Sequence, residues 1–171
     1  LKSNRYEAAR ETAQLVDILE QYPASLNCFL QTKVLDEAPS AVCALQTADI
    51  PVEFHAHSHT HPARKSADVE YEISKSVERV RSQFDTDHVG YRLPDGDAND
   101  GDYDTLVNYG VAFSSTVVPS WRPGRFNNVQ CSQEPFRHRE SGILELPFSV
   151  YSDLIRIPIS ISYIKFLGQC Y

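Results

Sequence analysis

Methionine is absent from all 171 residues of this chain. A complete open reading frame begins with methionine, so we expect that Leu1 is not the natural start and that the chain is the middle of a longer protein. The last residues, 163–171, form an apolar segment without a polar tail, which favours the same interpretation. We therefore expect a sequence that is truncated at both ends.

Long hydrophobic runs are also lacking. No apolar run approaches the roughly 20 residues that span a bilayer, and the polar N-terminal region has no signal-peptide core. Basic residues are outnumbered, because 16 Lys and Arg stand against 23 Asp and Glu, for a net charge of -7. Without a basic stripe that could replace counterions, a nucleic-acid partner is not expected. We expect no membrane span, and the oligomeric state is left open.

Paired cysteines are missing too. The four cysteines, at positions 28, 43, 131 and 170, show neither C-x-x-C spacing nor a disulfide framework. Buried free thiols are then the default expectation, and they suit a reducing compartment. The cysteines therefore favour a cytoplasmic protein.

What the sequence does contain is an alternation of predicted helices and strands. Helices are predicted over residues 4–22, 36–47, 66–84 and 102–109, strands over 24–30, 50–54, 89–92, 111–113, 143–146, 148–151 and 155–161, and a long polar loop over 119–142. The first helix carries an apolar stripe of Leu15, Ile18, Leu19 and Tyr22. The alternation predicts an α/β fold with a parallel sheet, as a single domain over residues 1–171.

Four of the six histidines lie within seven residues, directly after the predicted strand 50–54. Neutral imidazole is the commonest protein ligand for zinc and related metals, so the run is a candidate metal site. On a tight turn, His57 and His61 fall on the same side, whereas His55, His57 and His59 share a face only if the chain stays extended. A solvated histidine-rich loop is the alternative interpretation.

Two motifs resemble those of a known family. Residues 53–62, E-F-H-A-H-S-H-T-H-P, resemble the H-[ST]-x-x-H-P motif of the polysaccharide deacetylases, the carbohydrate esterases with NodB homology. Residues 91–96, Y-R-L-P-D-G, are similar to the R-x-P-x-G motif of that family, and 113–125, F-S-S-T-V-V-P-S-W-R-P-G-R, resemble a later segment of some members. The order and spacing of the two motifs make the resemblance specific, and it spans most of the chain.

The resemblance implies a partial or distorted (β/α) barrel and a metal-dependent deacetylase. His57 and His61 would bind a divalent metal, which is expected to be zinc, with cobalt or nickel as alternatives, and Ser58 would support the turn between them. The metal would activate a water that removes an acyl group, such as acetyl, from a sugar or polysaccharide. Acylated saccharide is therefore the expected partner.

The resemblance also implies roles for residues of the second motif. Arg92 would hold the catalytic carboxylate by a bidentate ion pair, for which planar guanidinium is suited. The groove for substrate would be shaped by Pro94, Asp95, Gly96 and Trp121. A plain surface position for Arg92 and a structural role for Trp121 remain open as alternatives.

Departures from the family pattern concern the rest of the site. The family's opening Asp-Asp pair, which supplies the base and a third metal ligand, should precede the first helix, and its closing histidine should follow residue 171. His138 is not taken as its replacement, and Asp95 stands where the family usually has an aromatic residue. With two histidines and no positioned carboxylate, we expect the chain alone to bind metal weakly and to have little activity.

Three other interpretations compete with this one. The acidic residues between 95 and 104 fail the EF-hand template, because Asp100 occupies the position that requires glycine, so a solvated loop before a helix is favoured. An amidohydrolase barrel acting on a non-sugar amide would place its H-x-H pair at the start of the domain. A degenerate deacetylase-like domain could bind saccharide or metal without catalysis, and the upstream sequence would distinguish it from an enzyme.

Overall fold

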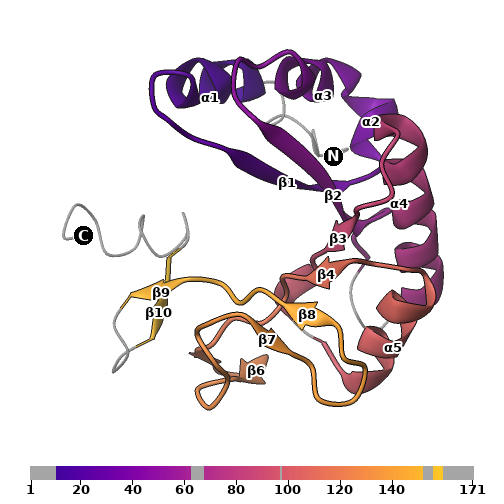
Figure 1. The fold of residues 1–171 in the computed structure, drawn as a ribbon, viewed down its shortest axis with the longest axis vertical. Helices are drawn as coiled ribbons and strands as arrows, with labels where there is room; N and C mark the ends of the chain where they lie inside the picture. Colours follow the sequence, from indigo (N-terminus) through magenta and orange to yellow (C-terminus); the bar gives the residue numbers. More distant parts are fainter. Residues whose placement is uncertain (1–10, 63–67, 97, 152–155, 160–171) are drawn as a thin grey trace. The chain divides into compact units, whose positions relative to one another are not determined.

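The computed structural model describes residues 11–62, 68–96, 98–151 and 156–159. The chain divides into two compact units, residues 1–89 and residues 90–171. Helices accompany parallel strands in each unit (Figure 1). The predicted α/β class with a parallel sheet is confirmed.

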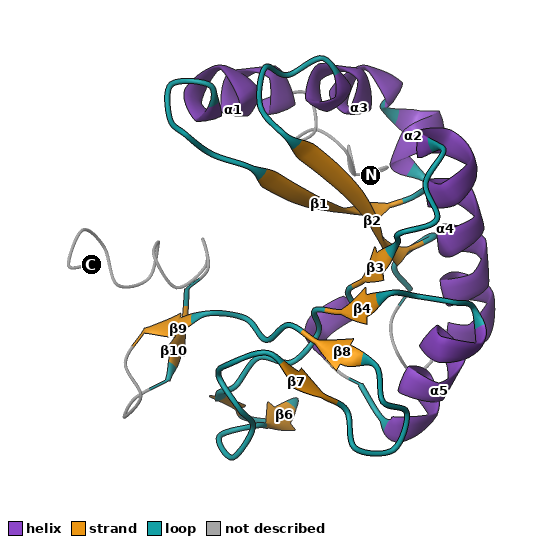
Figure 2. Ribbon diagram, in the orientation of Figure 1, coloured by secondary structure: helices purple, strands orange, loops and turns teal. Residues whose placement is uncertain are grey.

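The described residues of the first unit form two parallel strands and four helices, which are drawn in orange and purple in Figure 2. Its elements are α1 (Thr12–Leu19), β1 (Leu26–Gln31), α2 (Val34–Glu37), α3 (Pro39–Gln46), β2 (Val52–Ser58) and α4 (Val69–Phe84). Strand β1 pairs in parallel with β2, helix α4 packs against β2, and α1 packs against α3. The carboxyl ends of β1 and β2 therefore lie at the same edge of the unit.

Helix α4 confirms the prediction made from its apolar spacing. Ile73, Val77 and Val80 are fully buried, as expected for residues that recur every three or four positions along one helix face. The helix begins at Asp68, whose carboxylate accepts from the backbone N–H of Tyr71 at 3.0 Å. It ends at Asp85, which has a left-handed backbone with φ 47°.

Other predicted elements of this unit need correction. The predicted helix 36–47 is two helices, because Ala38 is non-helical with φ -146° and Pro39 starts α3 at a position where its missing N–H costs no bond. In α1, Leu15 and Ile18 are 48% and 55% exposed, so most of the expected apolar stripe does not face a core, and Val16 is buried instead. The expected cap of this helix, Asn4, lies outside the described residues.

The cysteines also differ from one another. Cys28 is a free, half-buried thiol in β1, and burial raises its pKa to about 11. Cys43 on α3 is exposed, which corrects the expectation of a buried thiol. Its neighbours Val42 and Leu45 are among the residues that α3 buries. Cys170 lies outside the described residues.

The described residues of the second unit form four neighbouring strands, two short antiparallel strand pairs, one α-helix and one 3-10 turn. Its elements are β3 (Gly90–Tyr91), η3 (Pro94–Gly96), α5 (Asp100–Asn108), β4 (Phe113–Ser114), β5 (Trp121–Arg122), β6 (Phe126–Asn127), β7 (Phe136–Arg137), β8 (Leu144–Glu145), β9 (Val150–Tyr151) and β10 (Ile157–Pro158). Strands β3, β4 and β8 are parallel, while β7 pairs with β8 in the opposite direction. The pairs β5–β6 and β9–β10 are antiparallel.

The acidic segment before α5 is a helix start, as predicted. Asn99 accepts from the backbone N–H of Asp102 at 3.1 Å, and Asp102 accepts from the backbone N–H of Asn99 at 2.8 Å, which completes a capping box. The predicted long loop 119–142 contains β5, β6 and β7. No helix among the described residues has the length and apolar character needed to cross a membrane.

Candidate metal-binding site

The histidine run is positioned by an irregular strand end. Strand β2 extends to Ser58, beyond the predicted end at residue 54, so His55 and His57 belong to the strand and do not follow it. Ala56 pairs with Leu30 and Ser58 pairs with Gln31, which makes His57 the additional residue of a β-bulge. A bulge redirects the side chain it carries, and such irregularities are common beside functional sites.

The four histidines of the run have different surroundings. His55 is 1% exposed, and its Nε2 lies 2.9 Å from Oδ1 of Asn27 on β1. His59 places Nδ1 at 3.0 Å from the hydroxyl of Thr32, just after β1. The rings of His57 and His61 lie with their centroids 5.0 Å apart and their planes at 52°. The structure therefore brings together the two histidines that the motif selected.

His61 reaches this position through an unusual backbone. Its φ is 56°, in the left-handed region that histidine adopts more readily than branched residues do. The ring of His61 is exposed and that of His57 is half buried. A dissolved ion could thus reach the pair from solvent.

The 5.0 Å separation of the two rings is compatible with a shared divalent ion. In a tetrahedral zinc site with Zn–N bonds of about 2.1 Å, two ring centroids are separated by about 5 Å. Within the described ranges, no group of three His, Cys, Asp or Glu side chains could hold a metal ion. The donor set offered by these residues is therefore a pair of imidazoles, which is half of a tetrahedral shell.

Helix α4 holds the loop between the two histidines. The Glu72 carboxylate accepts from the backbone N–H of His59 at 2.8 Å and of Thr60 at 2.7 Å. It also accepts from the Thr60 hydroxyl at 2.6 Å. Glu72 is only 7% exposed, so these bonds are made largely out of water, where a charged acceptor is strong.

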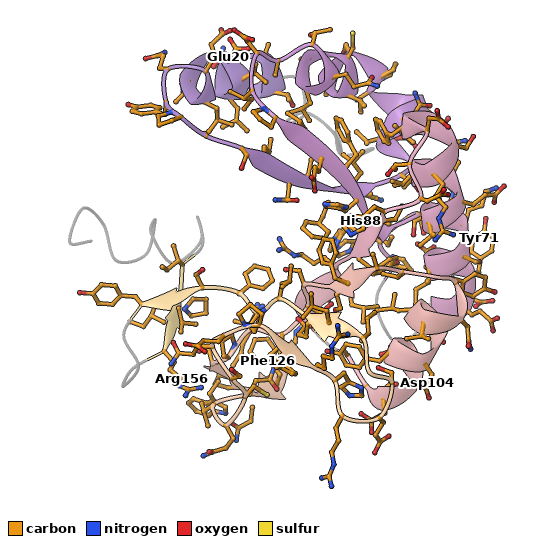
Figure 3. The ribbon with its side chains drawn as sticks, viewed as in Figure 1. Glu20, Tyr71, His88, Asp104, Phe126 and Arg156 are labelled. Carbon is orange, nitrogen blue, oxygen red and sulfur yellow. The ribbon has the colours of Figure 1, made fainter. Side chains whose placement is uncertain are left out.

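The end of β1 holds the same loop from the other side. The backbone N–H of Thr32 donates to the backbone oxygen of Ser58 at 2.8 Å, and the backbone N–H of Lys33 donates to the backbone oxygen of His59 at 3.2 Å. The ring of Tyr71, which is labelled on α4 in Figure 3, lies edge-on to His59 at 6.2 Å. The hydroxyl of Ser58 is buried and has no hydrogen-bond partner among the described residues.

In the second unit, Arg92 is fixed by the segment that follows β4. Its Nε donates to the backbone oxygen of Ser115 at 2.8 Å, and its Nη2 donates to the Ser115 hydroxyl at 2.7 Å. The guanidinium carbon lies 4.2 Å above the ring of Phe148. Burial lowers the pKa of Arg92, while the charge of Glu145 raises it. Arg92 is therefore partly buried and held by Ser115, and its ion pair with a catalytic carboxylate stays a prediction.

Pro94, Asp95 and Gly96 form the tight turn η3 after Arg92. Asp95 and Gly96 both have left-handed backbones, with φ of 63° and 68°. A side chain on Gly96 would meet Cγ2 of Val118 at 3.3 Å, so the turn leaves little room there. The turn is joined to the β5–β6 hairpin, because Oδ2 of Asp95 lies 2.8 Å from Nη1 of Arg125.

Trp121 lies on the same hairpin, in β5. It is 61% exposed, so its ring packs against little of the protein and is available to solvent. Its exposure is compatible with contact to a sugar ring, and it does not fit a role in the core. The four residues expected to shape a substrate groove thus belong to one connected part of the second unit.

The second unit also contains a buried carboxylate that accepts from backbone N–H groups, as Glu72 does in the first unit. Glu145 on β8 is fully buried and accepts from the backbone N–H groups of Thr116 and Val117 at 2.7 and 2.8 Å. The hydroxyl of Tyr103 donates to it at 3.3 Å. The ring of His138 stacks on that of Tyr103 with centroids 4.2 Å apart, and its Nε2 lies 3.3 Å from Oδ1 of Asp100, which places it in a structural network.

The sequence interpretation missed both carboxylates. Glu72 follows Val69 by three residues and precedes Ser76 by four, so it lies on the buried face of α4. Glu145 lies between Leu144 and Leu146 in a predicted strand. Each glutamate stands at a position of the sequence pattern where an apolar residue is expected. That pattern could have indicated a buried, hydrogen-bonded carboxylate, because ionisable groups are seldom buried unless they are paired.

Comparison with known proteins points to the same family as the two sequence motifs. A family model described as polysaccharide deacetylase matches residues 6–114. No curated protein sequence is significantly similar to the chain. Among solved structures, a protein from Mycobacterium smegmatis assigned to the polysaccharide deacetylases has 18% identity and a TM-score of 0.58, over 82% of this chain and 45% of its own.

A second protein of similar fold is a CE4-family pseudoenzyme from Bacillus anthracis. Its wild-type structure has 17% identity and a TM-score of 0.50, over 62% of this chain and 38% of its own. A mutant with restored enzymatic activity has 18% identity and a TM-score of 0.51, over 62% and 39%. The chain spans less than half the length of these structures, and their likeness shows the fold alone.

Proposed function

Because the chain belongs to the polysaccharide deacetylase family, we propose that it contributes to a metal-dependent hydrolase that removes acyl groups, such as acetyl, from a sugar or polysaccharide. The observation that carries the proposal is the 5.0 Å approach of the His57 and His61 rings within the motif of that family. When bound, a divalent ion such as zinc, cobalt or nickel would polarise the acyl carbonyl and lower the pKa of a bound water.

In this proposal, His57 and His61 bind the ion through neutral imidazole. The bulge at His57 and the left-handed backbone at His61 set the direction of the two rings. The bonds from Glu72 and from the end of β1 fix the chain between them. A site prepared in this way loses less entropy when it binds the ion.

Arg92 is proposed as the catalytic residue that orients a carboxylate. Its guanidinium is charged at neutral pH, and its Nε and Nη2 are held by Ser115, so its direction does not depend on the substrate. Pro94, Asp95, Gly96 and Trp121 are proposed to contact the saccharide, with the exposed indole of Trp121 as a stacking surface.

Metal titration of the chain tests this function. We expect one cobalt or zinc ion to bind the wild-type chain in calorimetry, with loss of binding in His57→Ala and His61→Ala. The exposed His88, outside the run, provides the matched control His88→Ala, which should bind as the wild type does. Unchanged binding in both His57→Ala and His61→Ala would remove the proposed metal site.

Acetate release from an acetylated amino-sugar polymer, with cobalt or zinc added, measures catalysis directly. We expect slow release by this chain that is lost in Arg92→Ala and His57→Ala. Metal binding without any acetate release would instead support the second candidate, a domain that binds metal or saccharide without catalysis.

A further inference from the structure

The chain between His57 and His61 is hydrogen-bonded to one side chain of α4, that of Glu72. His57 belongs to strand β2, whereas His61 follows the strand by three residues. Of the intervening residues, His59 and Thr60 donate three hydrogen bonds to Glu72, at 2.8, 2.7 and 2.6 Å. Glu72 therefore holds the two residues that directly precede His61.

Two other roles for Glu72 fit the structure less well. Its oxygens are both engaged, since Oε2 accepts the two backbone N–H groups and Oε1 accepts the Thr60 hydroxyl, and no three-ligand metal group includes it among the described residues. The cap of α4 is Asp68 rather than Glu72. Burying a carboxylate is costly, so the bonds to the loop account for its presence at this position.

We propose that Glu72 is the positioning residue of the metal site, which sets the affinity of His57 and His61 for a divalent cation by fixing the loop between them. This inference rests on the proposed function. Groups that orient metal ligands without touching the ion commonly change metal affinity by about 10- to 100-fold when they are removed. Glu72 acts at the backbone of the loop, one step further from the ion than a partner of the imidazole itself.

The variants separate geometry from charge. Glu72→Ala removes all three bonds and leaves two backbone N–H groups of the loop without their acceptor. Glu72→Gln keeps an oxygen that can accept the two N–H groups, while its amide can donate to the Thr60 hydroxyl, so the loop is retained without the negative charge. Glu78→Ala is the matched control, because Glu78 lies on the same helix with its side chain 69% exposed.

The experiment measures zinc and cobalt affinity by calorimetry, together with thermal melting of the metal-free protein. For Glu72→Ala we expect metal affinity to fall by about 10- to 100-fold. Glu72→Gln should stay within a few-fold of the wild type. Glu78→Ala should be unchanged. Amide hydrogen exchange should be faster at His59 and Thr60 in Glu72→Ala than in the wild type.

Three results would overturn the inference. Wild-type affinity in Glu72→Ala would show that the loop does not need the carboxylate, while loss of binding in His57→Ala would keep the proposed function intact. An equal loss of metal affinity in Glu72→Gln and Glu72→Ala would show that the charge of Glu72, and not its bonds to the loop, sets the affinity. A wild-type chain that binds no metal would end the proposed function, and this inference with it.

A further variant tests the inference even if Glu72→Ala does not fold. Thr60→Val removes only the 2.6 Å bond from the hydroxyl and keeps both backbone donors. It should weaken metal binding less than Glu72→Ala does, with an unchanged melting temperature. If Glu72→Ala fails to fold, wild-type affinity in Thr60→Val together with a large loss in Glu72→Gln overturns the inference, whereas a small loss in both supports it.

Discussion

The buried carboxylate of Glu145 allows a stability prediction of defined size. Glu145→Ala leaves the backbone N–H of Thr116, which is fully buried, without its acceptor, and does the same to the half-buried N–H of Val117. An unsatisfied buried donor costs about 1–3 kcal/mol, so we take about 2 kcal/mol for Thr116 and about 1 kcal/mol for Val117. We therefore expect Glu145→Ala to lower the free energy of unfolding by about 3 kcal/mol.

Urea denaturation provides the measurement, with the change read from the midpoint at constant slope. Glu145→Gln preserves the volume and one acceptor oxygen, so we expect a loss of about 1–2 kcal/mol. Glu140→Ala, at an exposed carboxylate of the same unit, should change the midpoint little. A loss below about 1 kcal/mol in Glu145→Ala would refute the reasoning that these two donors are fully desolvated.

A second measurement checks the same environment. Burial raises the pKa of Tyr103, and the charge and hydrogen bond of Glu145 raise it further. Glu145→Gln removes the charge, so the phenol of Tyr103 should ionise at lower pH than in the wild type. Ultraviolet absorbance of the phenolate during an alkaline titration would show the difference.

Two further predictions concern packing and pH. Gly90→Ala would place a Cβ 2.6 Å from Cε2 of the buried Phe113 ring, so calorimetry should show a loss of about 1–3 kcal/mol, and an unchanged melting temperature would contradict the described pairing of β3 with β4. Burial raises the pKa of Cys28 from 9.0 to about 11, so the unfolded thiol ionises first and stability should fall as pH rises through this interval. Urea midpoints across the same interval should fall less in Cys28→Ala, and equal slopes in both proteins would exclude the thiol as the cause.

Sequence periodicity predicted the elements whose burial is one-sided. Helix α4 was recognised because its apolar residues recur at the helical spacing and face a core, and strand β1 was recognised as a short apolar run. The same reasoning failed for α1, where Leu15 and Ile18 have the right spacing but are exposed. Spacing reports which side chains share a face, and it does not report what covers that face.

The candidate site was predicted as a set of residue types, and its geometry was not. The motif selected His57 and His61, whose rings do approach each other, but the extension of β2 and the bulge depend on pairing with β1, which lies more than twenty residues earlier. Glu72 was missed because its bonds go to a backbone whose path the sequence alone does not define. Long-range pairing therefore limited the prediction.

The bulge at His57 has a consequence for anyone who would transplant this motif into another scaffold. The ten-residue stretch that contains the histidines does not define the bulge by itself. The additional residue results from the pairing with β1, in which Leu30 pairs with Ala56 and Gln31 pairs with Ser58. On a regular strand, His57 would take the position opposite Gln31 that Ser58 holds here, and the register of the residues that follow would shift by one. Such a graft must carry the end of β1 along with the histidines.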